Sequence, residues 1–174
     1  MAAIDGMRER TLVVNAISKT GNATGWRVGW SISPPEYTPT IRGIHDTLVI
    51  QSPTPLQKGA ERLLRLDDVF YNNLWQEYFE KREVLIQGLR GARFSVTPPE
   101  GSYYFFCNYR DVPALSSLSP MDAAMYLIKE IGVASVPGDN FYASGDFGNS
   151  YLRFAFCRSI EALREAARRL KKLS

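Results

Sequence analysis

Two short strand-like runs, separated by a loop of small residues, constrain the fold of this chain most strongly. Residues 11–14 are apolar and β-branched, which predicts a buried strand, and residues 28–32 predict a second strand. Gly29 lies in the second run, where a strand glycine marks the close approach of a backbone or a ligand. We therefore expect two strands that flank and hold the loop between them.

The loop carries one lysine, Lys19, and one arginine, Arg27, among its small residues. Small side chains let a bound group approach the backbone amides, and amide donors beside a fixed cation suit a phosphate. Arg27 offers a planar fork to a phosphate, whereas Lys19 is a compact amine. A lysine at the end of a buried strand can lose its charge by desolvation and become a nucleophile. The loop therefore indicates a phosphate-binding turn beside a reactive amine.

The remainder of the chain alternates between helical and strand-like segments. Apolar spacing and the positions of proline, glycine and capping residues define these segments. Gly88 and Gly91 are expected to mark the end of the longest helix. The order of segments predicts α/β structure for the first third and α+β structure for the rest. Helices are expected at 39–50, 55–66, 67–89 and 121–130 and after Ser159, and further strands at 94–97, 102–108, 133–136 and 151–156.

Charge and hydropathy argue against a nucleic-acid-binding or membrane-spanning protein. The net charge is only +3, and the basic cluster at 164–172 is interpreted as a solvated helix face, so nucleic-acid binding is unsupported. No apolar run approaches the roughly 18 residues of a membrane span, and no signal peptide opens the sequence. We expect a cytoplasmic protein without membrane partners.

Metal-binding and hydrolase sites find no support in the sequence. Cys107 and Cys157 lack metal-like spacing and are expected to be buried free thiols. The aspartates, Asp146 among them, form no metal-ligand pattern, so no metal is predicted. The single histidine, His45, is placed on a helix surface, and nothing brings it beside a serine.

Lys19 and Arg27 lie eight residues apart in the frame SKT…TGWRVGW. This frame resembles the cofactor-lysine signature of the fold-type I, class I/II aminotransferases, which are pyridoxal-phosphate enzymes of the aspartate aminotransferase superfamily. The resemblance runs from Met1 to the C-terminus. The family usually has a phosphate-bonding serine three residues before the lysine, where this chain has Ala16, and Ser18 directly precedes the lysine. We expect weaker phosphate binding at a retained site.

The resemblance implies three roles. Lys19 would hold pyridoxal 5'-phosphate as a Schiff base, and its freed amine would move a proton between the substrate α-carbon and the cofactor. Arg27, with Ser18 nearby, would bind the cofactor phosphate. Arg153, a charge within the apolar run YLRFAF, would clamp the substrate α-carboxylate.

Each role has a simpler alternative that the sequence leaves open. Lys19 can be an ordinary exposed loop lysine, and Arg27 can stack on Trp26 or Trp30. Arg153 can face outward from a half-exposed strand. The aromatic segments at 100–104 and 137–142 resemble two further family segments, and they can form core or line an apolar pocket.

Family members are considerably longer than this chain, and the residues that contact the pyridine ring lie in their N-terminal half. The resemblance therefore implies a C-terminal half. Residues 1–67 would end the cofactor-binding large domain, and residues 68–174 would form the small α+β domain with a long linking helix. Family members work as homodimers, and the segment 51–57 is where we expect a contribution to the neighbouring active site.

The expected function is transfer of an amino group between an amino acid and a 2-oxo acid. The same fold type also houses lyases and synthases that use the same lysine. A different alternative is a catalytically inactive truncated fragment, or an interaction domain that retains the lysine loop. The absent half and Ala16 favour that alternative.

Overall fold

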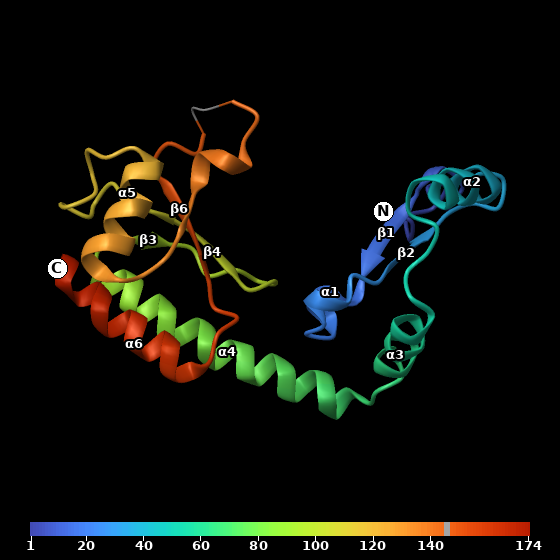
Figure 1. Cartoon of the computed structure of the whole chain (residues 1–174), viewed down its shortest axis with the longest axis horizontal. Coiled ribbons are helices and arrows are strands. Elements are labelled where there is room, and N and C mark those ends of the chain that lie inside the picture. Colours follow the sequence, from blue (N-terminus) through green and yellow to red (C-terminus); the bar gives the residue numbers. More distant parts are fainter. Residues whose placement is uncertain (145–146) are drawn as a thin grey trace. The chain divides into compact units, whose positions relative to one another are not determined.

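The computed structural model describes residues 1–144 and 147–174 and divides the chain into two compact units, 1–71 and 72–174 (Figure 1). The division falls inside helix α4 (Asp68–Gly91), and each unit is described by itself. Gly145 and Asp146 lie outside the described residues, and so do the expectations that concern them.

The first unit is built around a two-stranded antiparallel ribbon. Strands β1 and β2 pair in a register that sets Val13 opposite Ile32 and Ala16 opposite Gly29. A Cβ at Gly29 would lie 2.8 Å from the carbonyl oxygen of Asn15, so the predicted close backbone approach is confirmed. The elements are η1 (Arg8–Arg10), β1 (Val13–Ala16), α1 (Ile17–Thr20), η2 (Thr24–Trp26), β2 (Gly29–Ile32), α2 (Thr38–Val49) and α3 (Thr54–Leu64).

The prediction that the first strand is buried is wrong. Val14 is 82% exposed, and Val13 and Ala16 are only half-buried. Within the described residues the ribbon contains two strands and α2 buries none of its side chains, so apolar positions of β1 lack a covering layer. The strand itself is present, displaced two residues along the chain from the expected range.

A small core joins the loop between β1 and β2 to helix α3. Ile17, Ala23 and Val28 pack with Ala60 of α3. Gly59 lets the helix approach the ring of Trp26, since a Cβ there would lie 2.7 Å from Cζ3 of the indole. Gly21 lies equally close to Leu63. The loop that carries Lys19 and Arg27 therefore packs against helix α3.

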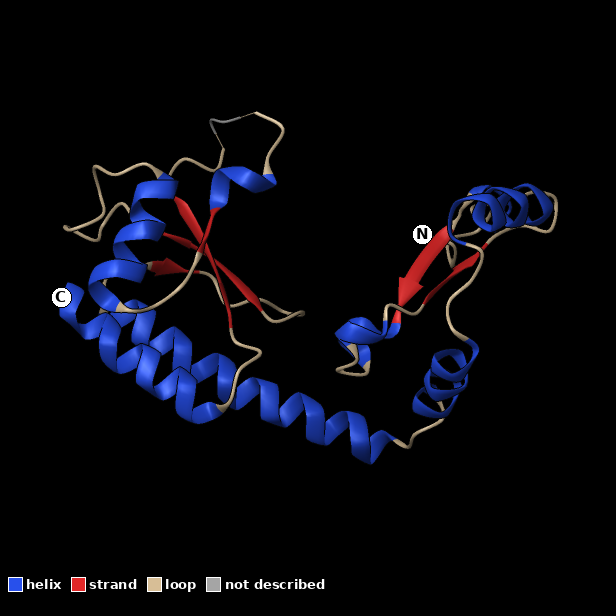
Figure 2. Ribbon diagram, viewed as in Figure 1, coloured by secondary structure: helices blue, strands red, loops and turns tan. Residues whose placement is uncertain are grey.

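The second unit is an antiparallel sheet with helices α4 and α6 packed side by side (Figures 1 and 2). In the described residues the strand order is β3-β4-β6-β5. The unit follows α4 with β3 (Ser95–Val96), β4 (Tyr104–Asn108), α5 (Pro120–Tyr126), the π-helical turn η3 (Leu127–Ile131), β5 (Val136–Pro137), η4 (Gly138–Phe141), β6 (Tyr151–Ala155), α6 (Ile160–Leu170) and η5 (Lys171–Leu173).

Side chains of the central strands alternate between the core and the opposite face of the sheet. Phe105 and Cys107 of β4 and Leu152 and Phe154 of β6 are buried in the core. Arg153 therefore projects from the other face, as expected for a residue between two buried neighbours. Burial raises the pKa of the Cys107 thiol to about 12, so this cysteine is an inert core residue.

Three predicted helix starts are confirmed by side-chain caps. The hydroxyl oxygen of Ser119 accepts from the Asp122 N–H at 3.1 Å, and that of Ser159 accepts from the Ala162 N–H at 3.3 Å. The Asp67 carboxylate accepts from the Phe70 N–H at 3.2 Å. Each cap satisfies a backbone donor that the first helical turn leaves free.

Three smaller predictions are wrong. Gly88 lies inside α4, where a Cβ would stand 2.6 Å from Cβ of Ala167 in α6, so it allows helix packing and does not end the helix. Of the expected strand 133–136 only residue 136 lies in a strand, β5. The preceding residues are not in the sheet, because Gly132 turns the chain with φ +74° and the Val133 N–H still donates to the carbonyl oxygen of Leu127. Cys157 is half-buried, not buried.

Candidate active site

The turns that carry Lys19 and Arg27 are tied to each other by two hydrogen bonds. The Ile17 N–H donates to the carbonyl oxygen of Val28 at 3.3 Å, which continues the β1–β2 pairing into α1. The Thr24 hydroxyl donates to the carbonyl oxygen of Ser18 at 3.1 Å. The residues before Lys19 and around Arg27 are thereby held in one compact turn.

Arg27 adopts an unusual backbone conformation and has a guanidinium that can take an anion. Its φ and ψ are 54° and 38°, in the left-handed region that non-glycine residues rarely occupy. Its Nη1 donates to the carbonyl oxygen of Thr24 at 3.2 Å. The side chain is exposed, and within residues 1–144 and 147–174 it has no carboxylate partner and no stacked tryptophan. The stacking alternative is therefore not what the structure shows.

Lys19 lies in α1 directly after Ser18, and its side chain is exposed. The expected dry environment for its amine is absent from the described residues, because α1 is a single turn at the end of an uncovered strand and buries only Ile17. Among the described residues, the Lys19 side chain is therefore not buried as the sequence predicts.

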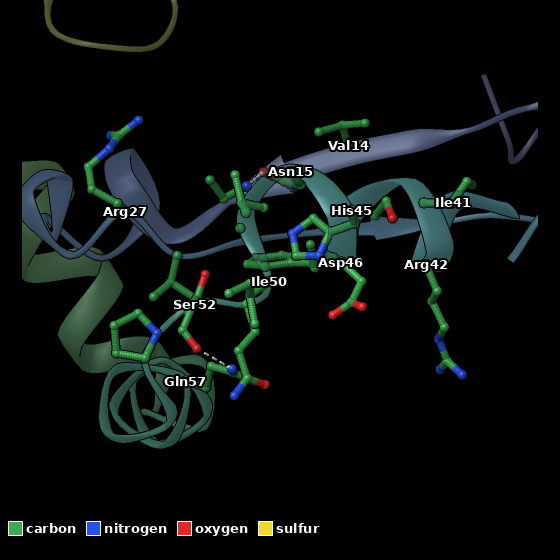
Figure 3. Close-up of a pocket in the computed structure, with 18 of the residues that line it drawn as sticks. Val14, Asn15, Arg27, Ile41, Arg42, His45, Asp46, Ile50, Ser52 and Gln57 are labelled. Carbon is green, nitrogen blue, oxygen red and sulfur yellow. Dashed lines mark hydrogen bonds between the residues drawn. The ribbon is translucent and has the colours of Figure 1, made fainter. Parts of the chain in front are cut away.

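A hollow of about 1310 Å³ opens beside the turn. Ser18 and Arg27 line it together with β1, β2 and α2, whereas Lys19 is outside the lining. Figure 3 shows Val14 and Asn15 on one strand and His45 and Ile50 at α2, with the Arg27 side chain projecting from its turn away from the labelled side chains of α2. The volume exceeds the roughly 300–1,000 Å³ of usual small-molecule pockets, so this is an open concavity.

The donors in this region fit a phosphate-bearing aldehyde. The Arg27 guanidinium, which has no carboxylate partner among the described residues, and the hydroxyl of Ser18 border the same hollow, and both can donate to phosphate oxygens. Lys19 supplies a primary amine on the adjacent residue. Ala16 offers no hydroxyl, and its N–H is already bonded to the Asn15 side chain at 2.8 Å. Ser18 and Arg27 are thus the residues here that would hold a phosphate.

Arg153 lies in the second unit, in β6, paired with Phe106 on one side and Val136 on the other. Its guanidinium carbon lies 4.4 Å from the ring centroid of Tyr104 and 4.4 Å from that of Phe141. Among the described residues it has no ion-pair partner. Two aromatic rings flank the guanidinium instead.

Sequence reasoning missed the role of Phe141 and of Thr24. Strand alternation places Tyr104 on the same face as Arg153, but Phe141 arrives from η4, and no periodicity links a 3₁₀ turn to a strand. Phe141 is in turn held edge-on by Phe106, with ring centroids 5.3 Å apart. Thr24 begins the TGWRVGW part of the motif but carries no charge, and its contacts became evident only in the folded turn.

Residues 1–144 and 147–174 show neither a metal site nor a membrane span. These residues contain no cluster of three or more histidine, cysteine, aspartate or glutamate side chains arranged to hold a metal ion. They also include no helix with the length and apolarity needed to cross a membrane.

Comparison with known proteins gives a consistent family match. A family model described as aminotransferase class I and II matches residues 2–170. The chain is 32% identical to the methionine aminotransferase of Escherichia coli over 167 residues, which cover 96% of this chain and 42% of that protein. It is 31% identical to a probable N-succinyldiaminopimelate aminotransferase of Mycobacterium tuberculosis, over all of this chain and 45% of that protein.

Solved structures agree with the sequence comparison. The N-succinyldiaminopimelate aminotransferase of Mycobacterium tuberculosis has a TM-score of 0.90 at 29% identity, covering 99% of this chain and 44% of that one. The Escherichia coli methionine aminotransferase has a TM-score of 0.86 at 32% identity, covering 98% of this chain and 44% of that one. The chain therefore spans less than half the length of the relatives it matches.

Proposed function

Because the chain belongs to the class I and II aminotransferases, whose members depend on pyridoxal 5'-phosphate, we propose that it is the C-terminal portion of such an enzyme. Residues 1–67 would belong to the cofactor-binding domain and residues 68–174 to the small domain. The reaction would move an amino group between an amino acid and a 2-oxo acid. We further propose that the complete enzyme is a homodimer.

The observation that carries this proposal is the compact turn at residues 17–28. It sets Ser18 and the Arg27 guanidinium at the border of one hollow, with Lys19 adjacent in the sequence. The left-handed backbone of Arg27 supports a binding role, since strained residues cluster at functional sites. A phosphate would receive hydrogen bonds from Arg27 in a bidentate pair and from the Ser18 hydroxyl.

When bound, pyridoxal phosphate supplies an aldehyde and a ring that withdraws electrons from the substrate α-carbon. Lys19 would hold the aldehyde carbon through its Nζ, and after release it would accept the proton of the substrate α-carbon at the same atom. Both steps need the uncharged amine, which burial favours, and the Lys19 side chain is exposed. This chain alone is therefore expected to bind the cofactor weakly and to turn over little.

Arg153 is assigned to the substrate α-carboxylate. Its guanidinium is held between two aromatic rings and has no ion-pair partner among the described residues, which leaves its edge available for a bidentate pair. The relatives include a methionine aminotransferase and a kynurenine–oxoglutarate transaminase. The aromatic surroundings of Arg153 support a substrate with an apolar or aromatic side chain here.

The proposal is tested with purified chain, pyridoxal phosphate, an apolar amino acid and a 2-oxo acid. Formation of the new 2-oxo acid, lost in Lys19→Ala, supports transamination, whereas elimination products in its place support a lyase. Cofactor binding at one equivalent with ordinary transaminase rates would contradict the expected weakness of the isolated chain. Cofactor binding that is unchanged in Lys19→Ala would remove the proposed role of Lys19.

The alternative function is that of an inactive fragment or interaction domain. Two observations favour it: the exposure of the Lys19 side chain and the lack of a hydroxyl at Ala16. Weak, Lys19-dependent cofactor binding with no product from any amino acid would support this alternative.

A further inference from the structure

We propose that Thr24 is a positioning residue, which fixes Arg27 relative to the turn that bears Lys19. The inference rests on the proposed function, because it concerns how the same site holds a phosphate. Thr24 lies between the two residues in sequence, at the start of η2, and is exposed. It uses both of its polar groups inside the turn.

The hydroxyl of Thr24 bonds the backbone of the residue before Lys19. Its Oγ1 donates to the carbonyl oxygen of Ser18 at 3.1 Å. Helix α1 is one turn long, and carbonyl oxygens at a helix end need partners from outside the helix. The Thr24 hydroxyl supplies such a partner on the residue that directly precedes Lys19.

The carbonyl oxygen of Thr24 reaches forward to the arginine. It accepts a hydrogen bond from Nη1 of Arg27 at 3.2 Å. The left-handed backbone conformation of Arg27 lets its side chain fold back toward Thr24. One residue thus bonds the backbone beside Lys19 and the guanidinium of Arg27. The separation of the amine from the phosphate-binding group depends on it.

This link matters because the turn contains two glycines close to Thr24. Gly21 and Gly25 flank it, and glycine has the widest backbone freedom. Since the Thr24 hydroxyl is exposed, water can replace its bond without disrupting the core. The expected effect of losing the hydroxyl is a looser site, not an unfolded chain.

Thr24→Val removes the hydroxyl and keeps the shape of the side chain. Loss of one ordinary hydrogen bond corresponds to about five-fold weaker phosphate binding. Thr24→Ser keeps the hydroxyl and is expected to bind as the parent chain does. Thr47→Val is the matched control, because the Thr47 hydroxyl also donates to a backbone carbonyl, that of Gly43 at 3.0 Å, within α2.

Inorganic phosphate is titrated into the full chain while the backbone amide NMR signals of the turn, residues 17–28, are followed. The same variants are then treated with pyridoxal phosphate and borohydride, and the label on Lys19 is measured by peptide mass spectrometry. Of Thr24→Val, Thr24→Ser and Thr47→Val, only Thr24→Val is expected to bind phosphate and pyridoxal phosphate more weakly than the parent chain. In an Arg27→Gln background, Thr24→Val is expected to have no further effect, because its action passes through Arg27.

Equal phosphate binding in Thr24→Val and the parent chain would overturn the inference. An equal loss in the Arg27→Gln background would overturn it too, since that result marks a general structural effect. Thr24-dependent phosphate binding without any label on Lys19 would uphold the positioning role and reject the proposed function. If neither probe binds, both are rejected.

Discussion

The guanidinium carbon of Arg153 lies 4.4 Å from the ring centroid of Phe141, a residue that approaches from outside the strand that carries the arginine. The ring of Tyr104 lies at the same distance. Aromatic faces attract a guanidinium and restrict its rotation, so the two rings orient Arg153 for a ligand at its edge.

Phe141→Leu removes one of these faces and keeps an apolar side chain. We expect Arg153 to bind a simple carboxylate about three-fold more weakly, the loss expected for a partly exposed cation–π contact. An acetate titration that follows the NMR signal of the Arg153 Nε–H measures this. Phe147→Leu, at a 69% exposed position, is the matched control, and equal affinities in both variants would contradict the orienting role.

Gly88→Ala is expected to destabilise the second unit by about 1–3 kcal/mol through overpacking. The added Cβ would stand 2.6 Å from Cβ and 2.7 Å from Cα of Ala167, and the backbone of α6 cannot move away cheaply. Urea unfolding followed by circular dichroism measures the change.

Gly91→Ala is the control for that substitution, because a Cβ at Gly91 meets nothing within 4 Å. Alanine is the better helix former, so this variant is expected to be neutral or slightly stabilising. Equal stability of the two variants would show that α4 and α6 do not pack as closely as described.

The carboxyl group of Glu165 makes the stability of the chain depend on pH in the acid range. Hydrogen bonds from Arg168 and Arg169 lower the pKa of its carboxyl to about 2. Because the folded-state pKa is depressed, this contribution is present above the ordinary value of about 4.5 and is lost as the pH falls toward 2. The pair is exposed, so the effect on the free energy of unfolding is small.

Glu165→Gln is therefore expected to flatten the fall of Tm between pH 5 and pH 2.5, as recorded by calorimetry at low salt. Glu130→Gln, an exposed carboxylate on the neighbouring turn, is the control. A parallel fall of Tm in Glu165→Gln and the parent chain would show that the arginines do not stabilise this carboxylate.

Local signals in the sequence predicted most of the helices and strands and the family of the chain. Ser119 and Ser159 predicted where their helices begin, because a capping side chain bonds a backbone N–H of the first helical turn. Both capping bonds are present. The burial of β1 was wrong because burial depends on which layers cover a strand, and no local pattern reports that.

The same distinction applies to the candidate site, where the sequence predicts contacts within one short motif but not contacts between distant elements. Lys19, Ser18 and Arg27 belong to one short motif, so their proximity followed from the sequence. The contact of Phe141 with Arg153 depends on where η4 leaves the sheet, which is a property of the folded unit. Gly88 was misassigned because glycine serves both helix ends and helix crossings, and only the position of Ala167 distinguishes them.

The central claim is that Lys19 and Arg27 form one cofactor-binding turn, and site-resolved labelling tests it most directly. The full chain is incubated with limiting pyridoxal phosphate and reduced with borohydride, and the label on each lysine is measured by peptide mass spectrometry. The account predicts a label concentrated on Lys19 and strongly reduced in Arg27→Gln. A label spread over Lys58, Lys171 and Lys172 as well as Lys19, and unchanged in Arg27→Gln, would contradict it.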